Sequence, residues 1–567
     1  MERNEIKPNF KKFIVLEKNL LSSYIILLGC AVIGMIRSPK VVRLRFAVLK
    51  DKIDYVLASL GQLGLVHFVD IKKTSDKELL NIVEPYELSS EAYRISEIHN
   101  RISRLITKIG LQPRKIMVND LDLKNQVSKI EEEVKNIESI LSDQSISKDL
   151  MQKHIDKLIN YEAALRALRE IEYVKAMYGG IVGRMLVFDC WVPKEKLNII
   201  TETIDKYSDQ LSIYEVIEDL EELEEKPPTI INEKSKLGGF AALTRGFGIP
   251  IYSEIDPSIF MMITFPIFFG IMFGDVGHGL MFLTASLYIL YIKKKQISIP
   301  DIFKPIVQGA DILIICAVFS IFFGFLYGEF LGSNEWFRML THIDEKPIYS
   351  ILGFSSLEEE VAEHRWFITL MKLCIYIGMF HIIFGLILDI INKITEKEYK
   401  HMLSGPVLWL WFYGTLTTLF TLYDFNSSTR VSQLLSDVFS ARNPPFLPIS
   451  PLYLLIAPAI AMFAVRTFIE GFTEALGETL EHLIASISNT ISYLRIFAFH
   501  LVHWAISQIG LMGKGSIYLF LSLPLATFLI MTLELLATFM QALRLHWVEW
   551  FLKFYRGEGY VFKPFQL

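Results

Sequence analysis

The side chains with the clearest capacity for chemistry lie near the C-terminal end of the chain, in a strongly apolar stretch. Arg495 stands in the middle of residues 487–503, which read ISNTISYLRIFAFHLVH. Arginine keeps its positive charge under almost all conditions, and a charge near the centre of a bilayer costs roughly 2.5–3.5 kcal/mol on insertion scales. Arg495 is therefore half of an ion pair between helices, a side chain that reaches the membrane surface, or part of an ion path.

The neighbours of Arg495 favour the ion path. At about 100° per residue, Ser488 lies within about 20° of Arg495 on a helical wheel, Glu481 within about 40° and His503 about 80° away. One side of a helix over this stretch would then carry a carboxylate, a hydroxyl, a guanidinium and an imidazole. Such a set is typical of the wall of a proton or ion path.

A second apolar helix, predicted over residues 533–549, carries a matching polar face. Glu534, Thr538 and Gln541 follow the i, i+4, i+7 spacing that places side chains on one side of a helix. Arg544 flanks that face. Each of the two helices thus combines a carboxylate with an arginine three to four turns away, which indicates a shared polar site inside the membrane.

These two stretches also resemble a known family. The runs SNTISYLRIFAFHLVH at 488–503 and QALRLHWVEWFLKFYRGEGYVFKPF at 541–565 resemble the membrane stator subunit of archaeal and vacuolar-type rotary ATPases. It is called subunit I in A-type complexes and subunit a in V-type complexes, and the resemblance extends from about residue 36 to the C-terminus. It implies an essential ion-translocating role for Arg495 and a helper role for Arg544.

The resemblance further implies that the chain is not an enzyme by itself. Its implied partners are a rotor proteolipid ring, peripheral-stalk subunits, a central-stalk cap subunit and membrane lipid. Each carboxylate of such a ring crosses lipid only when neutralised, and Arg495 would lower the pKa of that carboxylate by its opposite charge, so that the ion is released. The polar approaches would be lined by Arg544, Glu481, Glu534, His503, Ser488 and Gln541.

Composition divides the chain into a polar part and an apolar part. Of its 567 residues, 52% are hydrophobic, which is high for an ordinary soluble protein. The predicted order is an extension at 1–34, a cytoplasmic stator arm at 36–235, a linker at 236–257, an ion-translocating membrane domain at 258–550 and a cytoplasmic tail at 551–567. The extension, a basic flank before a short apolar run, indicates a signal-like segment, an anchor or a start that belongs at Met35.

Several classes of site are absent from the sequence. The net charge of −5 argues against nucleic acid as the main partner. The four cysteines are scattered, so no spacing predicts a metal site or a disulfide framework. The sequence contains no Walker-type phosphate loop and predicts no cofactor.

The fold is predicted to be mostly α-helical, with two α/β lobes in the arm. Strand–helix–strand patterns occupy 37–71, where His67 is interpreted as an edge or surface histidine, and a second such pattern follows residue 178. Between them, apolar residues three and four apart predict two long helices that run out and back as an antiparallel coiled coil. No catalytic cluster accompanies them, which indicates a mechanical role.

Eight membrane spans are predicted, the last two of them long and tilted. Asp275, in the tight FGDVGHG connection between the first two, is interpreted as a turn residue. Gly324 and Gly328 form a pattern of small residues that favours close helix contact. The spans lie near 259–274, 277–292, 306–330, 366–391, 404–423, 450–471, 480–510 and 516–549.

Charge predicts the orientation of the spans. The short connections 292–304 and 393–403 carry seven lysines, whereas the longer opposite loops 331–365 and 424–449 carry five lysines and arginines. The positive-inside rule therefore places the short connections, the arm and the C-terminus in the cytoplasm of a cell-membrane protein.

Two other functions fit parts of the sequence. A secondary transporter would show inverted repeats and helices broken near the midplane, and no clear repeat links the first four spans to the last four. A purely structural membrane anchor would not need the polar residues around Arg495. For a stator subunit of a rotary ATPase, the sequence fits protons as well as sodium ions, and ATP synthesis as well as ATP hydrolysis.

Overall fold

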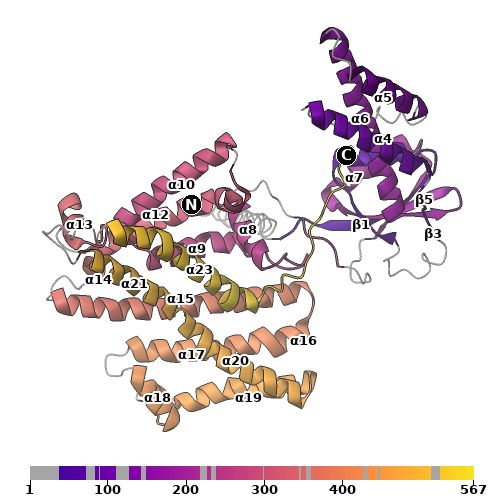
Figure 1. Cartoon of the computed structure of the whole chain (residues 1–567). Helices are drawn as coiled ribbons and strands as arrows, with labels where there is room; N and C mark the ends of the chain where they lie inside the picture. Colours follow the sequence, from indigo (N-terminus) through magenta and orange to yellow (C-terminus); the bar gives the residue numbers. More distant parts are fainter. Residues whose placement is uncertain are drawn as a thin grey trace, which may run out of the picture. The chain divides into compact units, whose positions relative to one another are not determined.

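The chain forms two compact units, shown in Figure 1 in the computed structural model. One unit comprises residues 38–231 with the C-terminal residues 559–567, and the other comprises essentially residues 232–558. The prediction of a mostly α-helical chain is confirmed. The predicted extension at 1–34 lies outside the described residues. The structure describes residues 37–71, 83–88, 90–109, 127–141, 148–217, 226–230, 238–297, 299–343, 346–352, 359–425, 431–444, 447, 449–511 and 524–567.

A single antiparallel sheet, whose strands do not follow the order of the chain, forms the centre of the first unit. Its strands follow the order β3-β4-β5-β1-β6, and β2 also pairs with β5. The long pair is antiparallel, with Val41 opposite Pro193 and Leu49 opposite Met185. The strands are β1 (Val41–Leu49), β2 (His67–Val69), β3 (Glu84–Pro85), β4 (Gly179–Val182), β5 (Met185–Pro193) and β6 (Ser212–Ile217).

The prediction of two separate α/β lobes is wrong, because both strand patterns enter this one sheet. β1 lies between β5 and β6 and is buried along most of its length, as its run of Val, Leu and Phe residues requires. Two helices, α2 (Ile53–Leu63) and α7 (Leu197–Tyr207), pack against each other. α2 ends at Gly64, whose φ of 61° is the left-handed conformation that glycine adopts without strain.

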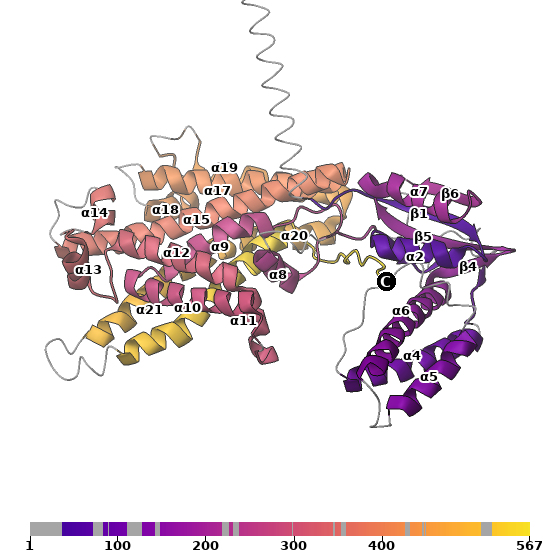
Figure 2. The same cartoon turned by 90° about the horizontal axis from the view of Figure 1, so that it is seen from above.

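Three helices extend the first unit on the side of β4: α4 (Ser90–Ile109), α5 (Val127–Leu141) and α6 (Lys148–Tyr178). Each packs against the other two, as the apolar spacing predicted. They are drawn as a bundle in both views (Figure 2). The out-and-back prediction thus corresponds to two helices, α4 and α5, that lie against the long returning helix α6. Their coiled-coil geometry stays a prediction.

The last residues of the chain also belong to this unit. The backbone N–H of Phe565 donates to the carbonyl of Val66 over 2.7 Å. The interpretation of His67 as an edge histidine is confirmed, because β2 pairs with β5 alone among the described strands. Nδ1 of His67 accepts a hydrogen bond from the backbone N–H of Lys563 over 2.9 Å. Burial lowers the pKa of the His67 imidazole, which agrees with the neutral ring that this bond requires.

The second unit consists of packed helices (Figure 1). Among the described residues, five helical segments are long and apolar enough to cross a membrane, and α9 is a shorter apolar helix. Two predicted spans, at 404–423 and 480–510, correspond to helices outside those five. The helices at the predicted spans are α9 (Ser258–Met272), α10 (Val276–Lys295), α12 (Ala310–Tyr327), α15 (Glu359–Thr395), α17 (Leu408–Phe425), α19 (Pro451–Ile469), α20 (Phe472–Ser492), α21 (Leu494–Leu511) and α23 (Leu535–Arg544).

The two long helices at the end of the chain are not regular α-helices. Tyr493 interrupts the first and separates α20 from α21; its hydroxyl lies 2.7 Å from Nδ1 of His381. The second, over residues 524–553, contains the π-helical turns Ile530–Glu534 and Leu545–Trp550 on either side of α23. Wide turns of this kind shift the side chains that follow them around the helix, and they often occur at functional sites.

The interpretation of Asp275 as a turn residue is confirmed. Its side chain caps α10 by accepting a hydrogen bond from the backbone N–H of His278 over 2.8 Å. α12 approaches this turn closely, since a Cβ on Gly324 would lie 2.4 Å from the backbone nitrogen of Val276. Gly328 instead ends α12 with a φ of 69°. Of the two small residues, Gly324 therefore makes the close helix contact.

Candidate functional site

Arg495 forms an ion pair in the second unit. Its Nη1 lies 2.8 Å from Oε1 of Glu549, in the π-helical turn that follows α23. The Arg495 side chain is 30% exposed, whereas that of Glu549 is 3% exposed. The Glu549 carboxylate is thus enclosed by the protein, whereas the Arg495 guanidinium is partly exposed. An arginine in this setting can exchange one carboxylate partner for another without losing its solvent or lipid contact.

An exposed apolar stripe precedes each arginine of the two motifs in the sequence. On α20 the stripe contains Leu480, Ile484, Ile487 and Ile491, each at least half exposed, and Arg495 follows four residues later. This spacing of three and four residues defines one helix face.

The last helix repeats the arrangement. Leu533, Leu536 and Met540 are exposed at the same spacing, and Arg544 follows four residues after Met540. Arg544 is itself exposed, and no ion pair is found for it among the described residues. Both segments therefore present an exposed apolar face that is followed in the sequence by an arginine.

The predicted polar residues His503 and Glu534 lie together, in the interior. Nδ1 of His503 is 2.9 Å from Oε1 of Glu534, and both side chains are buried. Thr538, also buried, and the half-buried Gln541 follow Glu534 along the last helix. The polar face predicted from the i, i+4, i+7 spacing thus points into the protein, while the apolar face with Arg544 points outward.

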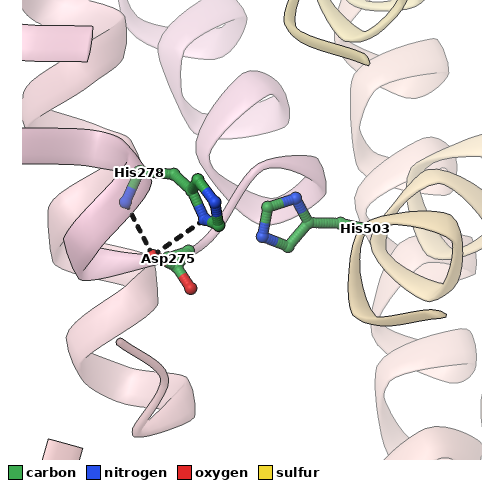
Figure 3. A group of neighbouring side chains, drawn as sticks. All are labelled: Asp275, His278 and His503. Atoms are coloured by element: carbon green, nitrogen blue, oxygen red, sulfur yellow. Dashed lines mark hydrogen bonds and ion pairs between the residues drawn. The ribbon is translucent and has the colours of Figure 1, made fainter. Parts of the chain in front are cut away.

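Two residues that the helix motifs do not contain join this cluster. Asp275 and His278 lie at the start of α10, and Nδ1 of His278 is 3.2 Å from Oδ1 of Asp275. Figure 3 shows the His503 ring reaching from α21 toward the His278 ring. The two rings are 5.4 Å apart and nearly perpendicular. All three side chains are buried, so the second unit encloses a compact polar cluster.

Glu481 lies in a different polar setting. It lines a cavity of about 390 Å³ together with Lys393, Arg466 and Lys553. Nη1 of Arg466 is 3.0 Å from Oε2 of Glu478 in this cavity. The cavity is mostly polar and charged, which suits water and ions more than an apolar ligand. The remaining lining residues are Asp389, His401, Ser404, Gly405, Pro406, Trp409, Glu470, His482 and Leu552.

Comparison with known proteins identifies the family. A model of the V-type ATPase 116kDa subunit family matches residues 89–339 and 465–567, which together make up more than half of the chain. The chain belongs to this family. The resemblance of the two C-terminal motifs is thereby confirmed, because both lie within the second matched segment.

Curated relatives come from both branches of that family. The vacuolar proton translocating ATPase 100 kDa subunit of Dictyostelium discoideum is 23% identical, over 82% of this chain and 69% of that protein. The V-type proton ATPase subunit a1 of Arabidopsis thaliana is 26% identical, over 68% of this chain and 58% of its own length. The A-type ATP synthase subunit I of Archaeoglobus fulgidus is 28% identical, over 60% of this chain and 54% of its own length.

The chain thus spans between about half and two thirds of the length of these relatives. Membership of a subunit family agrees with the expectation that the chain is not an enzyme by itself. The apolar helices of the second unit and the family together make it a multi-pass membrane protein.

Within this V-type ATPase 116kDa subunit family member, the predicted site residues do not form one wall. Glu481 lines the cavity, Ser488 is exposed beside the apolar stripe, Arg495 lies on the surface and His503 is buried. The interruption at Tyr493 lies between Glu481 and Ser488 on α20 and Arg495 and His503 on α21, so a regular helical wheel does not describe their positions.

Sequence reasoning missed Glu549, His278 and Lys553 as parts of these sites. Glu549 lies within the second motif, so an acidic residue in a membrane helix was a signal that could have found it. His278 follows Asp275 by three residues at a predicted helix start, which was a weaker signal. Lys553 lies at the end of the last helix, where a lysine is ordinary.

Proposed function

We propose that this chain is the membrane-embedded stator subunit of a rotary A/V-type ATPase, and that it carries protons between a rotor ring and the two sides of the membrane. The observation that carries the proposal is the setting of Arg495. Its guanidinium, 30% exposed, follows an exposed apolar stripe in a member of the V-type ATPase 116kDa subunit family. The relatives named as proton ATPase subunits favour protons over sodium.

The apolar stripes suit contact with a ring of apolar helices. A ring carboxylate that arrives from lipid is neutral, because an unpaired charge in hydrocarbon is costly. Beside Arg495 the charged form of that carboxylate becomes favourable, so the proton leaves. Arg495 then exchanges between the ring carboxylate and Glu549, and its fixed positive charge repels protons that would otherwise cross directly.

The buried cluster around His503 and the cavity that contains Glu481 supply the routes by which protons enter and leave. α10 runs from the turn at Asp275 to Lys293, Lys294 and Lys295, on the side that the lysine bias places in the cytoplasm. The cluster around His503 therefore belongs to the opposite side. The cavity that contains Glu481 includes Lys393 and His401 of a lysine-rich connection, and so belongs to the cytoplasmic side.

The first unit, residues 38–231 with 559–567, then lies in the cytoplasm as an arm. Its helices α4, α5 and α6 carry no catalytic cluster among the described residues, and we assign them to contact with peripheral-stalk subunits. A cysteine placed at position 442 should react with an impermeant thiol reagent from outside intact cells, whereas one at position 397 should not. The reverse labelling would overturn this orientation.

The central experiment is Arg495→Ala, measured as proton pumping in vesicles that contain the whole complex. Pumping should fall to background while the content of subunits stays at the wild-type level, since the guanidinium serves the ring carboxylate. Arg495→Lys should also lose most pumping, because an amine in an apolar site can give up its proton whereas a guanidinium cannot.

The matched control is Arg442→Ala, an exposed arginine outside both motifs, which should pump as the wild type does. Normal pumping by an assembled Arg495→Ala complex would refute the proposal. Failure of the Arg495→Ala complex to assemble would instead favour a purely structural ion pair with Glu549.

A further inference from the structure

Asp275, His278 and His503 have the composition and spacing of a metal-binding site. Each offers one ligand atom, and these atoms all lie within 4.8 Å of one another. All three side chains are buried, and they come from two segments of the second unit, the start of α10 and the middle of α21 (Figure 3). Two imidazoles and a carboxylate are a ligand set that zinc and related ions accept.

The His503 ring is oriented as a zinc-binding histidine is. Its Nδ1 is tied to Oε1 of Glu534 over 2.9 Å, which leaves Nε2 directed elsewhere. Nε2 of His503 has no hydrogen-bond partner among the described residues, and neither does Nε2 of His278. A histidine that binds metal through one nitrogen usually binds a carboxylate through the other, because this fixes the tautomer and the ring.

The Asp275 carboxylate is also fixed before any ligand arrives. Its Oδ2 accepts a hydrogen bond from the backbone N–H of Gly332 over 2.7 Å, and its Oδ1 accepts one from that of Leu331 over 3.0 Å. These bonds come from the loop after α12 and hold the charged carboxylate beside the two rings. A buried anion next to two imidazole nitrogens that lack hydrogen-bond partners is an arrangement that a divalent cation would complete.

We propose that Asp275, His278 and His503 bind one divalent transition-metal ion of the Zn²⁺ class, with the Glu534 carboxylate supporting His503. Zinc–nitrogen bonds of about 2.0–2.1 Å require the ligand atoms to move closer together, and the His278 ring, whose Nε2 has no hydrogen-bond partner among the described residues, can turn toward the fixed His503 ring. Oxygen-preferring ions such as Mg²⁺ and Ca²⁺ do not fit a pair of imidazoles. Binding does not depend on the proposed proton path, although an ion on His503 would close the route that contains it.

The test uses the purified full chain in detergent, stripped of metal and titrated with Co²⁺, whose visible d–d absorption reports low-symmetry coordination. Wild type should bind one Co²⁺ per chain, and Zn²⁺ should displace it. His278→Ala and His503→Ala should lose this site. Glu534→Gln should keep it with an affinity weaker by roughly 10–100-fold, the effect of removing a carboxylate that supports a histidine ligand.

His546→Ala is the matched control, because His546 is equally buried but both its ring nitrogens have partners, Thr264 Oγ1 and the carbonyl of Ala542. It should bind Co²⁺ as the wild type does. If an alanine variant does not elute as a monodisperse protein, His278→Gln and Asp275→Asn take its place. No saturable binding by wild type, or equal binding by wild type and the ligand variants, overturns the proposal and leaves the stator function untouched.

Discussion

Two arginine–carboxylate pairs of nearly equal length lie in the two units of this protein, and their surroundings differ. In the sheet of the first unit, Nη2 of Arg43 is 3.0 Å from Oδ2 of Asp189. Among the membrane helices, Nη1 of Arg495 is 2.8 Å from Oε1 of Glu549. Distance alone does not distinguish the two pairs.

Burial does distinguish them. Arg43 and Asp189 are both almost fully buried; Arg43 also lies over the ring of Trp191, and Asp189 receives a second guanidinium from Arg45. Neither side chain of the Arg43–Asp189 pair is accessible to solvent beyond 2%. The carboxylate of the membrane pair is equally buried, but its guanidinium is 30% exposed.

The comparison shows how one pair of residue types serves two purposes. A fully enclosed pair cannot lose a partner without leaving a charge in the interior, so it holds the fold. A pair that is open on the guanidinium side can release its cation to a second carboxylate, as a stator requires. Three substitutions, ordered by their expected effect on the free energy of unfolding, test this difference.

Arg43→Ala should have the largest effect on stability. The substitution takes the nearer guanidinium from the buried Asp189 carboxylate and leaves the longer contact to Arg45 at 3.5 Å, and removal of one partner from a buried pair costs roughly 3–5 kcal/mol. Hydrogen exchange of the β1 and β5 amides in the full chain measures the loss of local stability. Arg184→Ala, an exposed arginine at the turn between β4 and β5, is the control and should change stability by less than about 0.5 kcal/mol. Equal exchange in the two variants would contradict the structural role of Arg43.

Glu549→Gln should have a smaller effect on stability and a measurable effect on transport. The substitution leaves no buried charge, and the Arg495 guanidinium stays partly exposed. The free energy of unfolding should therefore fall by no more than about 1 kcal/mol. In the proposed mechanism, the guanidinium without Glu549 keeps its ring carboxylate longer, and pumping should slow by roughly two- to fivefold, the equivalent of about 0.4–1 kcal/mol. Loss of assembly, measured as subunit content, would show that this pair is structural as well.

Arg544→Ala should have the smallest effect on stability. Its side chain is exposed on the last helix, and no ion pair is found for it in the described part of the chain. The free energy of unfolding, followed by the thermal midpoint of the complex, should therefore change by no more than about 0.5 kcal/mol, the range of surface substitutions. Pumping should fall, but less than in Arg495→Ala, because Arg544 flanks the path without holding Glu549. A complex that does not assemble would assign Arg544 a structural contact instead.

Helix positions in the second unit were predictable because they rest on local properties. Residues 276–295 and 451–469 are apolar over lengths that match a membrane helix, and the helices α10 and α19 lie there. The Asp275 turn was predictable for the same reason, since its cap closes within three residues. The close approach of Gly324 followed from its missing side chain.

The partners of the site residues were not predictable in the same way. A helical wheel assumes a regular helix, and it placed Glu481, Arg495 and His503 on one side. The interruption at Tyr493 and the π-helical turn Leu545–Trp550 changed which faces meet. His503 and Glu534 were both chosen from sequence, but their contact across 31 residues was not specified by either motif.

The sequence by itself determined that this chain places arginines in strongly apolar helices near its C-terminal end, and its motifs identified the family. These properties depend on residue type within a short window, because the cost of a charge in lipid and the helical period are both local. Tertiary structure decided that Arg495 pairs with Glu549, that Asp275 and His278 meet His503, and that two strand patterns share one sheet. Such contacts join residues far apart in the chain, 146 positions in the case of Arg43 and Asp189 and more in the case of His278 and His503, and they form only when packing brings particular faces of separate elements together.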